Sequence, residues 1–140
     1  MAERGLEGID QTVQKTHIWL NDIAERFHGD KHQALQILRS FLQVVRDHLG
    51  VDESAQFAAQ LPLLVRGMYY EGWDPSRTLQ HERSADSFLQ HFLEGTNLRS
   101  MDGPRAVQVA AETIRLHVSA GEGDEVFGSL PESIRELLLV

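Results

Sequence analysis

The sequence contains no cysteine, and this absence excludes several kinds of chemistry at once. A chain without cysteine has no disulfide framework, no thiolate ligand for a metal and no thiol nucleophile. It also has no apolar run long enough to cross a membrane, and its polar first five residues lead into no apolar signal segment. We therefore expect a cytoplasmic protein with no membrane partner.

Basic residues are scarce. The 140 residues include 13 Lys and Arg against 21 Asp and Glu, which gives a net charge of −8. Only two lysines occur, Lys15 and Lys31, and the arginines are spread along the chain without a cluster. A negative chain without a basic cluster repels the phosphate backbone of nucleic acids. Nucleic acid is therefore not expected as a partner.

The chain lacks the sequence strings that mark common catalytic sites. It contains no Gly-x-Ser-x-Gly and no His-Glu-x-x-His, and the glycines at 121–124 alternate with carboxylates where a phosphate would bind. We therefore predict a protein that is not an enzyme and has no cofactor. An enzyme whose groups meet only in the folded chain, for instance Asp22, Glu25 and His28, is the weaker alternative.

Two of the seven histidines have a spacing that suits a metal. His28 and His32 are four residues apart, which would place both imidazoles on one helical face. Asp30 lies between them and has the position of a helix cap, so His28 is expected to end one helix and His32 to begin the next. No third ligand accompanies them, and we predict no metal site.

What the sequence does contain is an internal repeat. The segment 60–68 (QLPLLVRGM) matches 129–137 (SLPESIREL), with Leu-Pro followed by an aliphatic residue and arginine in register at an offset of 69 (131 − 62). Upstream, 34–37 (ALQI) matches 106–109 (AVQV) at an offset of 72 (106 − 34). Changes in loop length around conserved helical segments are typical of duplicated units.

Apolar residues recur at helical spacing in each copy, which indicates amphipathic helices that face a core. The stripes of the first copy are Leu20, Ile23, Ala24 and Phe27, and then Ala34, Ile37, Leu38, Phe41, Val45 and Leu49. Those of the second copy are Ala85, Phe88, Leu89, Phe92 and Leu93, and then Val107, Ala110, Ile114 and Val118.

Local signals predict where several helices begin. Asp30 stands three residues before Gln33, the arrangement of a capping box, so a helix should start there. Asp52 is expected to cap the short helix that follows it. Pro62 and Pro131 suit the first turn of a helix, where the missing N–H has no intrahelical partner to lose.

These observations predict an all-α helical bundle made of two tandem, related four-helix units. We divide the chain into an N-terminal tail at 1–11, a first repeat at 12–73, a linker at 74–83 and a second repeat at 84–140. A unit of about 60 residues buries only ~60% of its surface. The two units are therefore expected to share one core.

The two Leu-Pro segments and the junction sequence YEGWDP at 70–75 resemble the domain of unknown function family 2267. The resemblance extends from about Thr12 to Leu139. It implies a bacterial or archaeal all-α protein made of two related halves. That family has no established activity, and the resemblance supplies no catalytic residue.

The aromatic junction between the copies is the first candidate site. Tyr69, Tyr70 and Trp73, with His81 nearby, combine large rings with polar edges, as ligand pockets and partner interfaces do. The competing interpretation is a clasp that fixes the two halves, because bulky aromatics also serve as core anchors.

The apolar C-terminus is the second candidate site. Leu138, Leu139 and Val140 end the chain, and residues on all sides of a final helical turn cannot all face one core. We assign them to an interface with a partner chain.

Together these features favour a non-enzymatic interaction or adaptor protein of unknown pathway, with a stress-related role as one hypothesis. Its partner would be another protein or a second copy of the chain. The alternative is a small-ligand carrier with an aromatic pocket at the junction of the repeats.

Overall fold

The computed structural model describes residues 2–76 and 84–139. The described residues form helices and turns with no strand, which confirms the predicted all-α bundle. The α-helices, with one 3₁₀ turn η1 at Ser100–Asp102, are α1 (Ala2–Phe27), α2 (Lys31–Arg46), α3 (Val51–Ala58), α4 (Leu63–Tyr70), α5 (Ala85–Glu94), α6 (Gly103–His117), α7 (Glu122–Gly128) and α8 (Glu132–Leu138).

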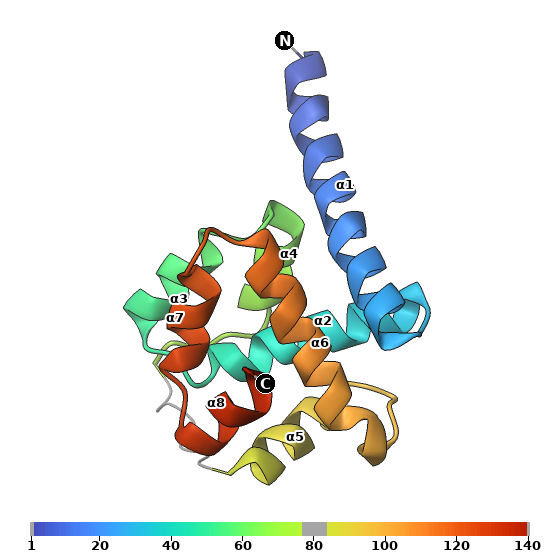
Figure 1. Ribbon diagram of the computed structural model, residues 1–140. Helices are drawn as coiled ribbons and strands as arrows, with labels where there is room; N and C mark the ends of the chain where they lie inside the picture. Colours follow the sequence, from blue (N-terminus) through green and yellow to red (C-terminus); the bar gives the residue numbers. More distant parts are fainter. Residues whose placement is uncertain (1, 77–83, 140) are drawn as a thin grey trace.

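Helix α1 is longer than the apolar pattern indicates. Residues 2–11, which we expected as a tail, form its first turns. The helix ends after Phe27 because His28 adopts a left-handed conformation with φ of 62°. In Figure 1 the N-terminal part of α1 projects away from the other helices, and its C-terminal part lies against them.

The capping box at the start of α2 is confirmed. The Asp30 carboxylate accepts the backbone N–H of Gln33 at 2.8 Å, and the Gln33 side chain accepts the backbone N–H of Asp30 at 3.1 Å. His28 and His32 therefore lie on either side of a helix break, as the sequence predicts.

The expected cap of α3 was wrong. The N-cap is Gly50, which has no side chain to offer, and Asp52 lies inside the first turn. The helix begins earlier because the Gly50 carbonyl already accepts the N–H of Ser54 at 2.9 Å. Asp52 still suits its place, since a carboxylate near a helix N-terminus interacts favourably with the helix dipole.

The two Leu-Pro segments have matching local structures. Pro62 directly precedes α4, and Pro131 directly precedes α8. In each case the arginine four residues later donates back to a carbonyl in the preceding turn: Arg66 Nη2 to Ala59 at 3.5 Å, and Arg135 Nη1 to Gly128 at 3.3 Å. The sequence match thus extends to a side-chain hydrogen bond at the same offset.

The helices of the two halves of the chain are interleaved. Helix α1 packs against α6 as well as against α2, and α5 packs against α2 as well as against α6. Helix α2 also contacts α6, and α3 contacts α7. The buried apolar residues accordingly form a cluster to which helices before and after the junction both contribute.

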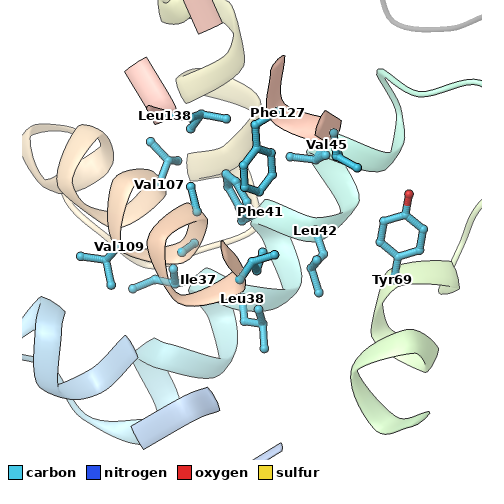
Figure 2. Packing of buried hydrophobic residues seen from close by; sticks show 14 of the residues in the cluster. Ile37, Leu38, Phe41, Leu42, Val45, Tyr69, Val107, Val109, Phe127 and Leu138 are labelled. Carbon is cyan, nitrogen blue, oxygen red and sulfur yellow. The ribbon is translucent and has the colours of Figure 1, made fainter. Parts of the chain in front are cut away.

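Helix α2 runs through the middle of this cluster (Figure 2). Phe41 is fully buried and meets the rings of Phe88 and Phe127 edge-on, with centroids 6.3 and 5.8 Å apart. On the same helix the Ser40 hydroxyl donates to the carbonyl of Phe92 at 2.6 Å. Helix α2 therefore holds the second half of the chain through both apolar and polar contacts.

A buried arginine ties the end of α2 to the end of α4. Arg46 is only 6% exposed, and its Nη1 donates to the carbonyls of Tyr69 at 3.0 Å and Glu71 at 2.7 Å. Its Nε donates to the Asp47 carboxylate at 2.9 Å, which balances the charge. We call this group of bonds the Arg46 clasp.

Tyr69 forms the apolar side of the same region. Its ring is fully buried and lies edge-on to Phe57, with centroids 5.5 Å apart, and its hydroxyl shares a hydrogen bond of 2.8 Å with the Ser54 hydroxyl. Burial raises the pKa of Tyr69 to about 12, because the phenolate would lose its hydration inside the core.

The Arg46 clasp yields a prediction on stability. Replacing Arg46 by Met leaves two carbonyls near the core without their donor, so we expect the free energy of unfolding in urea to fall by about 2–4 kcal/mol. The control is Arg39→Met, which removes an exposed ion pair of 2.5 Å with Glu71. It should cost at most about 1 kcal/mol. Equal losses in the two variants would contradict the clasp.

The pKa of Tyr69 yields a second prediction. Since the folded-state pKa lies above the ordinary value of 10.0, this group has no effect on stability at neutral pH. Between pH 10 and 12 it should lower the free energy of unfolding by about 2 kcal/mol, because only the unfolded chain loses the proton freely. Urea unfolding across this range tests it: in Tyr69→Phe the decline should be smaller by that amount, and an unchanged decline would contradict the assignment.

Candidate functional site

The aromatic residues at the junction form a stack that runs outward from the core. Tyr69 lies edge-on to Tyr70 at a centroid distance of 5.4 Å, and Tyr70 lies against Trp73 at 5.3 Å. Tyr69 is buried, whereas Tyr70 and Trp73 are half-buried. His81 lies outside the described residues. Only the outer two of the three rings are placed where a ligand or partner could touch them.

The apolar C-terminus mostly covers the protein's own core. Leu138 is 2% exposed within the buried cluster, and Leu139 is half-buried and packs against it. Val140 lies outside the described residues. An interface at this end would therefore have to be made by the residues after Leu138.

The fold brings together an acid–histidine pair that the sequence does not indicate. Asp22 of α1 and His117 at the end of α6 are 95 positions apart, yet Asp22 Oδ2 lies 2.5 Å from His117 Nε2. The imidazole also stacks on the buried ring of Trp19, with centroids 5.3 Å apart and planes 23° from parallel. From the sequence, His117 is a single histidine within a helix with no partner motif, and Asp22 was considered only beside His28.

This pair lacks the third member of a nucleophilic triad. Among the described residues, Asp22 is the one hydrogen-bond partner of His117, and no hydroxyl or amine is bonded to it. Across residues 2–76 and 84–139, no three His, Asp or Glu side chains are grouped in a way that could hold a metal ion. What the pair does is to fix the end of α6 against α1.

Beside the pair lies a hollow of about 480 Å³, which we call the α1–α4 pocket. Its lining comes from Lys15, Ile18 and Trp19 of α1, the segment 59–63 that leads into α4, Arg66 and His117. This volume falls within the range of small-molecule sites. The ionisable lining residues are all basic, although the chain has a net charge of −8.

A second hollow of about 680 Å³ lies between α1, α6 and α7, and two of its three arginines are paired with carboxylates. Arg26 pairs with Glu112 at 2.5 Å, and Arg115 pairs with Asp124 at 2.7 Å. Arg105 donates to the Arg26 carbonyl at the end of α1. These arginines join helices to one another, and we assign them a structural role.

The projecting part of α1 exposes an apolar stripe. Leu6 and Ile9 are 59% and 58% exposed, and Val13 continues the same face at 36%. Helix α4 begins beside this stripe, since the N–H of Leu64 donates to the Thr12 hydroxyl at 3.1 Å. We call Leu6, Ile9 and Val13 the exposed stripe. It is the second candidate that sequence reasoning missed, because we assigned these residues largely to a tail.

No helix among the described residues has both the length and the apolar character to cross a lipid bilayer. A search of curated proteins finds no match. Residues 16–137 match the model of a family described as an uncharacterized conserved protein, DUF2267. The match begins just after the exposed stripe and covers the bundle. The chain therefore belongs to the DUF2267 family, as the Leu-Pro segments and the junction sequence predicted.

Proposed function

We propose that this is a non-enzymatic interaction protein whose exposed stripe docks an amphipathic helix of a partner protein. The observation that carries the proposal is the large exposed area of Leu6 and Ile9 on a helix whose other end packs against the bundle. An apolar face of this kind on a projecting helix is typical of helix-to-helix recognition.

The stripe continues a packing surface that α1 uses inside the molecule. Leu6, Val13 and Leu20 recur every seven residues, and Ile9 and Ile23 are two such steps apart, with Thr16 between them. Leu20 and Ile23 are buried against the bundle. Seven-residue spacing keeps apolar side chains on one face of a helix. The face of α1 that packs against α2 and α6 near its C-terminal end therefore continues to its N-terminal end, where no described residue covers it.

Charge favours a partner helix with basic residues beside its apolar face. Glu7 and Asp10 lie one turn apart, are exposed and border the stripe on one side. On its other side Thr12 is bonded to α4. A second copy of the chain would bring its own Asp10 against this acidic border, whereas lysines or arginines would pair with it.

We further propose that the bundle consists of two related four-helix units, and that the protein acts in the bacterial cytoplasm. Each half has two longer helices followed by two shorter ones, and the arginine bonds after Pro62 and Pro131 match. The exchange of partners between α1, α2, α5 and α6 supports a pseudo-twofold relation between the units.

The small-ligand carrier with a pocket at the aromatic junction is the second candidate. The partial exposure of Tyr70 and Trp73 favours it. The buried state of Tyr69 does not, because its ring and hydroxyl already have partners in the core.

The docking proposal predicts selective binding of a synthetic peptide. A leucine-faced helical peptide bordered by lysines should bind, and the same peptide with glutamates in place of lysines should bind at least about tenfold more weakly, because like charges then face Glu7 and Asp10. Fluorescence anisotropy of the labelled peptides measures both affinities. Added salt should weaken the first complex.

The matched variants are Ile9→Asp and Met101→Asp. Both side chains are exposed, at 58% and 74%, so neither change should alter the thermal midpoint by much. Ile9→Asp should weaken peptide binding at least about tenfold, and Met101→Asp should leave it unchanged. Equal binding by both variants, or a concentration-dependent dimer in sedimentation that Ile9→Asp abolishes, would overturn the assignment of a basic partner helix.

A further inference from the structure

The α1–α4 pocket combines basic donors with apolar walls, and we propose that it binds a small organic carboxylate with an apolar body. This site is separate from the exposed stripe and does not depend on helix docking there. Three elements build it: α1, the turn that leads into α4, and the end of α6.

Lys15 supplies an unneutralised positive charge. It lines the pocket from α1, and its ammonium group has neither an ion pair nor a hydrogen bond with any described residue. The other lysine, Lys31, lies outside the pocket with its ammonium group 3.2 Å from His17 Nδ1. A cation beside apolar walls attracts an anion more strongly than a cation in open water does.

Arg66 supplies a second charge, and its position is fixed. Its Nε donates to the Ala58 carbonyl at 2.9 Å, and its Nη2 donates to the Leu61 carbonyl at 3.2 Å. These bonds hold the guanidinium at the end of α3 without neutralising it, because the acceptors are carbonyls. Within the described residues Nη1 has no partner, so it remains available to a ligand.

Gln60 adds a neutral donor whose orientation is set from outside the pocket. The Ser119 hydroxyl donates to Gln60 Oε1 at 2.7 Å. With the oxygen engaged, the amide nitrogen is the end of the side chain that a ligand meets. The pocket thus offers donors from Lys15, Arg66 and Gln60, and its lining contains no carboxylate that would repel an anion.

The remaining walls suit an apolar body. Ile18 and Leu63 are 51% and 64% exposed, which is costly for large apolar side chains unless something covers them. Leu61 and the ring of Trp19 are buried at 3% exposure and close the inner side. A simple inorganic anion would leave these walls wet, whereas an organic acid would cover them.

His117 and Asp22 act as positioning residues. The contact between Asp22 and His117 and the stack on Trp19 hold the imidazole in the pocket wall and keep the indole in place. Trp19 therefore reports on the pocket, and it is one of only two tryptophans in the chain. Trp73 lies at the junction and can be removed to isolate this signal.

The test uses the full chain with Trp73→Phe, so that Trp19 is the only tryptophan. Octanoate and 4-phenylbutyrate are titrated, with their uncharged amides and inorganic phosphate as matched probes. At least one of the acids should change the Trp19 emission saturably, and the amides and phosphate should not at equal concentrations. Isothermal titration calorimetry on the unmodified protein measures the same affinity without relying on fluorescence.

Two lysine variants provide the matched comparison. Lys15→Gln should weaken binding of the acid at least about tenfold, because it removes a charged donor, and Lys31→Gln should leave it unchanged. Far-UV circular dichroism checks the folding of both variants, which should be unaffected because both side chains are exposed. No saturable heat or emission change with either acid would overturn the proposal, as would equal binding of acid and amide, or unchanged affinity in Lys15→Gln.

Discussion

Helix α2 must be covered on several sides, because most of its side chains from Ala34 to Arg46 are buried. Its neighbours come from both halves of the chain: α1 and α4 from the first half, and α5 and α6 from the second. A single half could not supply that cover, since a unit of this size leaves much of its apolar surface in water. The short helix α7 packs against both α3 and α8 (Figure 1), and all three contribute buried residues to the same cluster.

Local signals in the sequence were enough to predict the all-α class and several helix ends. The Asp30–Gln33 box at the start of α2 depends on neighbours within one turn. The cap of α3 was misplaced because a glycine can occupy an N-cap through its backbone alone. The pairing of Asp22 with His117 had no sequence signal, since it depends on how α1 crosses α6. The α1–α4 pocket was missed for the same reason.

The molecule uses arginine in two physically different ways. Arg46 is buried and donates to carbonyls at the end of α4, so its removal leaves these carbonyls without their hydrogen-bond donor. Arg66 makes similar bonds at the edge of a pocket and retains unused donor capacity. Both residues hold a helix end through hydrogen bonds to its carbonyls. The buried charge of Arg46 serves stability alone, whereas the more exposed charge of Arg66 is also available to a ligand.

The interleaving of α1 with α6 and of α5 with α2 also determines how the chain responds to being cut. A break in the backbone between α4 and α5 would leave the core contacts between the two pieces intact, because residues on both sides of the break contribute to the buried cluster. The pieces would stay together as one particle, and each alone would expose the apolar face of its long helices. From this arrangement of helices we therefore expect fragment complementation, in which two separately produced halves reassemble on mixing.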